Sequence, residues 1–231
     1  MATIRLLAVV LIALPLGGPA IAQNDGAEAP PPVLSGLKAE AAERVDAQHK
    51  LVQEIIDSLF SFSELAFQEF ETKRYLTEVL EANGFVIDDD VSGIPSAWWA
   101  TWGQGDPVIA LGSDVDGIPR SSQLPGAVYR KPLIEGAPGH GEGHNSGQAV
   151  VIAAALAVKE IMQREGLGGT LVIWPGVAEE LLGAKAWFTR DGRFDEVDAV
   201  LFTHVDDSMN TAWGQPQGTG LVSVESTLEG V

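Results

Sequence analysis

Cysteine is absent from this chain of 231 residues, which excludes disulfide bonds and thiolate metal ligands. Basic residues are scarce: 14 Lys and Arg stand against 32 Asp and Glu, for a formal net charge of −18. Such an acidic surface repels phosphate groups, so we expect no nucleic-acid partner. Hydrophobic residues make up 45% of the chain, enough to build a core. These features predict an acidic globular protein.

The chain also lacks an uninterrupted apolar run of the roughly 20 residues that a membrane-spanning helix needs. Near the N-terminus, the short run 6–16 follows Arg5 and precedes a Gly/Pro break and the segment Ala20-Ile21-Ala22. This order is typical of a secretory signal peptide. We predict a signal peptide over residues 1–22 and a periplasmic or secreted protein without membrane association after cleavage. A retained membrane anchor is the alternative.

Small residues and proline dominate the segment that follows the predicted cleavage site. This composition predicts a disordered linker over residues 23–34, with the folded part starting near Ser35. Apolar residues then recur at three- and four-residue spacing from Val45 to Leu59, which predicts one amphipathic helix of about six turns. A second helix is predicted over 69–83.

The rest of the chain alternates strand and helix patterns. Apolar segments bounded by turn residues predict strands at 85–88, 97–102, 108–112, 170–174 and 200–203. Apolar periodicity predicts further helices from about 145 to 166 and at 180–190. An irregular loop is expected over 121–138. The order of these elements predicts an α/β fold.

Acidic residues or histidine directly follow three of the predicted strands. They are Asp114 and Asp116, Glu179 and Glu180, and His204. Because open α/β sheets keep their sites at the carboxyl ends of the strands, we expect these side chains to share one crevice. Each group taken alone has an ordinary alternative, either a polar turn or an acidic first turn of a helix.

The segment GHGEGHNSG places His140, Glu142 and His144 alternately with glycine at the start of the predicted helix 145–166. Imidazole nitrogen and carboxylate oxygen are ordinary zinc ligands. Together with the residues at the strand ends, this cluster predicts a metal site for zinc, with manganese or cobalt as alternatives. A flexible polar loop is the other interpretation.

These motifs resemble a known family. SELAFQEFET, PVIALGSDVDGIP, GHGEGHNSG, the Glu179-Glu180 pair and RFDEVDAVLFTH are similar, in order and spacing, to the zinc-dependent aminoacylase and carboxypeptidase-type metallopeptidases, in particular their aminobenzoyl-glutamate hydrolase-like branch. The resemblance covers residues from about Leu51 to His204. It implies a three-layer αβα catalytic domain of a zinc exopeptidase that binds two metal ions.

The resemblance also implies a role for individual residues. His144, Glu180 and His204 match metal ligands, Glu179 matches the general base, and Asp116 matches the carboxylate that orients the site.

Three further positions match the metal ligands of the family less directly. Glu142 stands where this branch usually has a cysteine ligand, and we expect a carboxylate ligand in its place. Asp114 occupies a position that is a metal-binding histidine in other branches, so it is a possible ligand. His140 is also a possible ligand, although a role behind the ligands suits it better.

The resemblance further implies that a dimerisation (lid) domain is inserted after the first part of the catalytic domain. We therefore assign residues 35–217 to the catalytic domain and 218–231 to the first strand of the lid, the strand pattern lying over 220–229. Since the chain stops at Val231, we expect a fragment that is inactive alone and a homodimer when full length.

The implied reaction is hydrolysis of the amide bond of an N-acyl or N-aroyl amino acid, or of a small peptide, by a metal-activated water that Glu179 deprotonates. Two alternatives remain at this stage. One is a secreted, non-catalytic metal- or ligand-binding protein on the same fold. The other is a purely structural α/β domain, which would require the candidate ligands to lie far apart.

Overall fold

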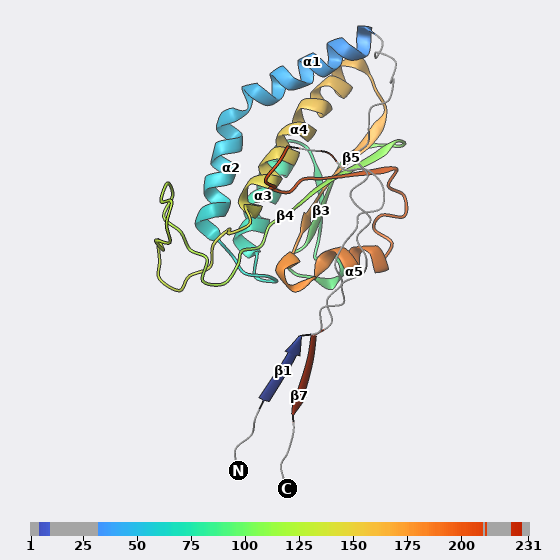
Figure 1. Cartoon of the computed structure of the whole chain (residues 1–231). Helices are drawn as coiled ribbons and strands as arrows, with labels where there is room; N and C mark the ends of the chain where they lie inside the picture. The colour runs from blue at the N-terminus through green and yellow to red at the C-terminus, as the bar shows by residue number, and fades with distance from the viewer. Residues whose placement is uncertain (1–4, 10–31, 210, 212–222, 228–231) are drawn as a thin grey trace. The chain divides into compact units, whose positions relative to one another are not determined.

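The computed structural model describes residues 5–9, 32–209, 211 and 223–227 (Figure 1). The chain divides into two compact units, one formed by residues 30–206 and the other by residues 1–29 together with 207–231. The larger unit contains a mixed sheet and the described helices. None of the described helices is long and apolar enough to cross a membrane.

The larger unit is built on a five-stranded sheet in the order β2-β3-β5-β4-β6. Its strands are β2 (Val86–Asp89), β3 (Trp98–Gln104), β4 (Val108–Asp114), β5 (Gly169–Gly176) and β6 (Ala199–Phe202). Strands β2 and β3 run antiparallel to their neighbours, whereas β4 pairs in parallel with both β5 and β6. The carboxyl ends of β4, β5 and β6 therefore lie along one edge of the sheet.

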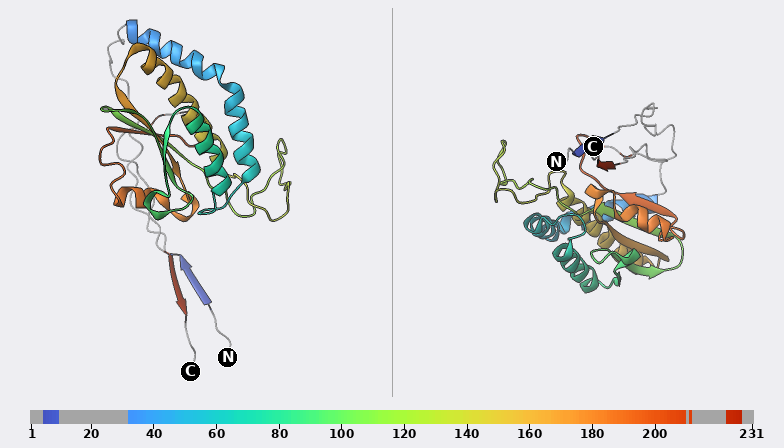
Figure 2. Two further views of the ribbon diagram at one scale, coloured as in Figure 1. Left: turned by 180° about the vertical axis from the view of Figure 1, so that it is seen from behind. Right: turned by 90° about the horizontal axis from the view of Figure 1, so that it is seen from below.

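Helices cover both faces of this sheet (Figure 2). The helices are α1 (Pro32–Ala47), α2 (His49–Phe62), α3 (Phe70–Ala82), α4 (His144–Glu165) and α5 (Ala184–Arg190). Helix α4 packs on β4 and β5, and α1 and α2 pack on α4. On the other face, Phe188 of α5 lies edge-on to Trp99 and Trp174, with ring centroids 6.1 and 6.2 Å apart. This is the three-layer α/β arrangement that the sequence predicted.

Gln148 joins α4 to the two central parallel strands. Its side chain is fully buried, and Nε2 donates to the carbonyl oxygens of Ser113 (2.8 Å) and Trp174 (3.1 Å). A buried amide is tolerated only when it is hydrogen-bonded, so these bonds fix the helix relative to the strand ends. The first turn of α4 is thereby held beside the carboxyl ends of β4 and β5.

The predicted strands are confirmed with small shifts at their ends, but two predicted helices are wrong in their extent. The single helix expected through Val45 to Leu59 is divided at Gln48, whose ψ of 8° lies outside the helical range and whose Nε2 donates to Ala153 of α4. The helix predicted over 180–190 is a 3-10 turn, η2 (Glu179–Leu181), followed by α5. Leu182 separates them with a left-handed backbone.

The predicted linker over 23–34 is too long at its C-terminal end. Helix α1 begins at Pro32, and proline suits a first helical position because the amide that it lacks would have no partner there. The rest of the linker and the boundary at 217 lie outside the described residues.

The smaller unit contains a two-stranded ladder. β7 (Ser223–Thr227), within the strand predicted over 220–229, pairs antiparallel with β1 (Arg5–Val9). The sequence did not predict this partner, because β1 belongs to the segment interpreted as a signal peptide. The signal peptide stays a prediction.

We predict that Gly147→Ala destabilises the larger unit. Gly147 lies in α4, and an added Cβ would be 1.7 Å from Ser113 Oγ and 2.6 Å from Ser113 Cβ. Relieving this overlap requires the helix to move from the sheet, at a cost of about 1–3 kcal/mol. Urea denaturation followed by circular dichroism measures the change.

Gly36→Ala is the control for this substitution. Gly36 is an exposed residue of α1 with nothing within 4 Å of an added Cβ. Alanine is favoured over glycine in a helix by about 1 kcal/mol, so the stability should stay equal or rise slightly. Equal unfolding midpoints for the two variants would contradict the packing described for α4.

Candidate active site

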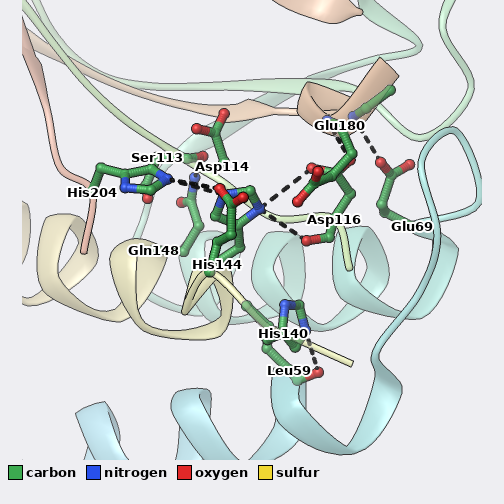
Figure 3. A network of polar contacts seen from close by, with 12 residues as sticks. Leu59, Glu69, Ser113, Asp114, Asp116, His140, His144, Gln148, Glu180 and His204 are labelled. Atoms are coloured by element: carbon green, nitrogen blue, oxygen red, sulfur yellow. Dashed lines mark hydrogen bonds and ion pairs between the residues drawn. The ribbon is translucent and has the colours of Figure 1, made fainter. Parts of the chain in front are cut away.

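The predicted site residues meet at the edge where β4, β5 and β6 end (Figure 3). Asp114 is the last residue of β4, and Asp116 follows two residues later. Glu179 and Glu180 form the η2 turn after β5, and His204 follows β6. The residues at the three strand ends therefore lie along one edge of the sheet, as expected.

His144 is the central side chain of this cluster. It is the first residue of α4 and only 3% exposed. Its Nδ1 donates to the carbonyl oxygen of Asp116 at 2.9 Å, which directs Nε2 into the site. Nε2 lies 3.1 Å from Nε2 of His204 and 3.9 Å from Oε2 of Glu142. The glycine-rich segment at the start of α4 and the chain after β6 thus direct candidate ligand atoms toward one place.

Gly143 lets the chain enter α4 in this position. Its φ is +75°, in the left-handed region that other residues avoid, and an added Cβ would lie 2.6 Å from Val205 Cγ2. The glycine-rich segment and the chain after β6 can therefore approach each other closely. This contact brings His204 next to His144.

Two overlapping groups of side chains each offer ligand atoms within 4.8 Å of one another. They are Glu142, His144, Glu179 and Glu180 in one group, and Asp114, His144 and His204 in the other. Carboxylate oxygens and imidazole nitrogens are the donors that zinc, manganese and cobalt accept, so the residues fit a metal ion. The predicted ligands Glu142, His144, Glu180 and His204 are brought together, and Asp114 joins them.

The electrostatics of the site favour a cation. Burial lowers the pKa of His144, but the nearby carboxylates of Asp116 and Asp114 outweigh it and raise the pKa to about 9. Burial raises the pKa of Glu180, and the nearby carboxylates of Glu142 and Asp116 raise it further. Crowded carboxylates of this kind are stabilised when a cation binds among them.

Asp114 has a partner that the sequence analysis missed. Its buried carboxylate contacts Lys185 Nζ at 2.7 and 3.0 Å, and the same ammonium lies 4.5 Å from the centre of the Phe202 ring. Burial raises the pKa of Asp114, whereas Lys185 lowers it. Lys185 therefore compensates the charge of Asp114 from within the protein.

His140, the other possible ligand, lies outside both ligand groups. Its Nε2 contacts the carbonyl oxygen of Leu59 at 3.0 Å, and burial lowers its pKa. The structure thus joins the His140 side chain to the end of α2. Figure 3 shows it pointing away from His204 and Glu180.

One basic and one acidic residue also lie in this region, and the sequence analysis did not identify either as a site residue. Lys185 contacts Asp114, and Glu69 accepts a hydrogen bond from Ala178 next to the Glu179-Glu180 pair. No local spacing could identify them, since their partners are 71 and 109 residues away in the chain. Each stands within two residues of an aromatic residue in the sequence, which is too weak a signal to single them out.

No protein-family model matches the chain. Among curated proteins, the chain is 36% identical over 162 residues to a subunit of the p-aminobenzoyl-glutamate hydrolase of Escherichia coli K12, in an alignment that covers 70% of this chain and 34% of the relative. It is 30% identical over 150 residues to the N-acetyl-L-cysteine deacetylase of Bacillus subtilis, covering 63% and 34%.

A solved structure shares the fold of the larger unit. It is a dinuclear metal-binding peptidase of the M20 family from Bacillus subtilis, with a TM-score of 0.59 and 26% identity over 70% of this chain and 44% of that protein. The chain belongs to this family of amidohydrolases and peptidases. It spans about a third of the length of the curated relatives that it matches. The resemblance inferred from the motifs is confirmed.

We predict that Lys185→Met destabilises the metal-free protein by leaving Asp114 buried without its cation. Lys185 is partly exposed, so the loss should be smaller than for a fully buried pair, about 1–3 kcal/mol. Urea denaturation in the presence of EDTA measures it.

The double variant Asp114→Asn with Lys185→Met tests the pairing itself. Since asparagine carries no charge, the double variant should recover at least half of the stability lost in Lys185→Met. If the two changes simply add, Lys185 does not compensate Asp114.

Proposed function

We propose that this M20 family chain provides the metal site and the general base of a hydrolase that cleaves an amide bond. The observation that carries the proposal is the group formed by Glu142, His144, Glu179 and Glu180, whose ligand atoms lie within 4.8 Å of one another. A carboxylate next to a set of metal ligands is the arrangement that water activation requires. The relatives named for amide hydrolysis support the same reaction.

We assign the metal ligands to Glu142, His144, Glu180 and His204, with Asp114 as a further candidate for a second ion. Two zinc ions are our proposal, supported by the dinuclear metal-binding relative and by the two overlapping ligand groups. A bound zinc ion would act as a Lewis acid toward the amide carbonyl and lower the pKa of a water molecule.

Glu179 is assigned as the general base. It lies beside Glu180 in η2, and adjacent residues direct their side chains differently, so one can bind metal while the other faces the water. Glu179 takes a proton from the attacking water and returns it to the nitrogen of the leaving amine. The proton balance of the hydrolysis is complete after this transfer.

Asp116 is assigned a supporting role. Its backbone oxygen accepts from His144 Nδ1, and Oδ1 lies 3.6 Å from the same nitrogen. These contacts fix the tautomer of His144 and hold Nε2 toward the site. Asp116 therefore keeps a ligand oriented and does not itself need to touch the substrate.

For the whole protein, we propose a small amide substrate: an N-acyl or N-aroyl amino acid, or a dipeptide. The names of the relatives support this class, since they include an aminobenzoyl-glutamate hydrolase, an N-acetyl-L-cysteine deacetylase and a dipeptidase. A periplasmic or secreted location, from the predicted signal peptide, and a homodimer, from the family resemblance, are further parts of the proposal.

A non-catalytic metal-binding protein is the second candidate function. The observation in its favour is Glu142, which stands where this branch of the family usually has cysteine and whose side chain is half exposed. If the carboxylate binds metal without supporting turnover, the protein would retain the ion but not the reaction.

We predict that Glu179→Gln strongly slows hydrolysis and leaves metal binding intact. Glutamine has nearly the same shape but cannot accept the proton, so kcat should fall by about 10²–10⁴-fold. Turnover is measured with the protein as encoded by its gene, on a panel of N-acyl and N-aroyl amino acids. Metal binding is measured by mass spectrometry of the metal content.

Glu54→Gln, an exposed substitution on α2, is the control for this experiment and should change neither quantity. Metal binding without turnover by the unsubstituted protein would favour the second candidate function. Absence of bound metal would overturn both.

We further predict that Glu142→Ala weakens zinc binding about tenfold or more, because a charged ligand is lost. Glu142→Cys should restore the affinity, since a thiolate is also a good zinc ligand. Calorimetric titration of zinc into the metal-free protein measures both variants. Unchanged affinity in Glu142→Ala would remove Glu142 from the ligand set.

A further inference from the structure

The turn that carries Glu179 and Glu180 has a strained backbone. Ala178 before it and Leu182 at its end have φ values of +53° and +56°, in the left-handed region that residues with a side chain rarely adopt. The turn closes on itself, since the amide of Gly183 donates to the carbonyl oxygen of Ala178 at 2.8 Å. Because neither left-handed residue is glycine, neighbouring segments must hold this shape.

Two buried carboxylates accept hydrogen bonds from backbone amides of the turn (Figure 3). Oε1 of Glu69 accepts from the amide of Ala178 at 2.8 Å, and Oδ2 of Asp116 accepts from the amide of Glu180 at 3.0 Å. Glu69 is 1% exposed and Asp116 is fully buried. Both amides therefore depend on these side chains, since a buried amide without an acceptor is costly.

Glu69 is held in place by the start of α3. It is the residue that precedes the helix, so its backbone is fixed by the first helical turn. The carboxylate of Glu64 accepts from the amides of Glu71 and Thr72 at 2.9 and 2.8 Å and anchors that turn. The side chain of Glu69 is thus free of the helix and directed at Ala178.

The segment before α3 also contacts the far side of the turn. The Phe67 ring lies edge-on to Trp187 of α5 at 6.5 Å, and a Cβ added to Gly183 would be 3.1 Å from Phe67 Cζ. Phe67 therefore packs against the turn near Gly183, and Glu69 accepts a hydrogen bond from the turn at Ala178. These contacts explain how the turn persists without glycine at its two left-handed positions, Ala178 and Leu182.

We propose that Glu69 is a positioning residue that fixes the direction of Glu179 and Glu180 through its hydrogen bond to Ala178. The proposal rests on the function proposed above, in which Glu179 is the base and Glu180 a ligand. Glu69 contacts neither side chain and acts only through the backbone of the turn. Its loss should loosen that turn before it affects the sheet.

The chemistry of Glu69 indicates a suitable conservative variant. Burial raises the pKa of its carboxyl, an effect that the Ser96 hydroxyl and the Ala178 amide oppose. The bond to Ala178 needs an oxygen acceptor and no charge. Glu69→Gln keeps this acceptor at nearly the same volume, whereas Glu69→Ala removes it.

The test compares Glu69→Ala and Glu69→Gln with Leu76→Ala. Leu76 is a fully buried residue of the adjoining helix α3, and its truncation removes only apolar atoms. Amide hydrogen exchange of the metal-free chain, measured by NMR, reports the turn through Ala178 and the sheet through Ile173 of β5. Calorimetric titration with zinc reports the ligands.

In Glu69→Ala, we expect exchange at Ala178 to accelerate at least about tenfold relative to Ile173, because its acceptor is gone. Zinc affinity should fall about tenfold with it. Glu69→Gln should restore both quantities. Leu76→Ala should lower the unfolding temperature but keep the ratio of the two exchange rates.

An unchanged exchange ratio in Glu69→Ala would overturn the proposal. An equal loss of zinc affinity in Leu76→Ala, compared under conditions in which the two variants are equally stable, would overturn it too. Failure of Glu69→Gln to restore the exchange ratio would overturn it as well. The exchange measurement needs neither metal nor turnover. If zinc does not bind at all, the proposed function fails, and the exchange ratio still decides whether Glu69 holds the turn.

Discussion

The parallel ladder of β4 with β5 and β6 is the constraint on which the rest of the molecule depends. Its register pairs Asp114 with Gly176 and Gly112 with Phe202, so the three strands end at nearly the same level. Side chains that are far apart in sequence therefore start from one edge. Gln148 adds the first turn of α4 to that edge through two buried hydrogen bonds. The two groups of candidate metal ligands follow from these two arrangements.

Packing several carboxylates at this edge costs free energy, because each is partly removed from water. The protein compensates in different ways. Asp114 has Lys185, while Asp116 accepts from the amide of Glu180 and lies next to His144. The half-exposed Glu142 has no lysine or arginine among the described contacts and lies 3.9 Å from the imidazoles of His144 and His204. A metal ion bound here would add positive charge among these carboxylates.

The turn after β5 has a strained backbone. A left-handed backbone at Ala178 and Leu182 is unfavourable by about 1–2 kcal/mol for each residue. Support comes from the carboxylates of Glu69 and Asp116, which belong to other segments. Strain of this kind is common where a site must hold its groups in one geometry.

The strands, the apolar helix α4 and the polar residues at the strand ends could be predicted from the sequence, because apolar periodicity and glycine-rich turns are local properties. Together with the motif resemblance, this was enough to find the family and most residues of the candidate site. The folded protein was needed to reveal the break at Gln48, the pairing of Asp114 with Lys185 and the hydrogen bond from the Ala178 amide to Glu69. Each of these depends on partners 71 to 109 residues apart, and such distances are closed by packing, which no local pattern records.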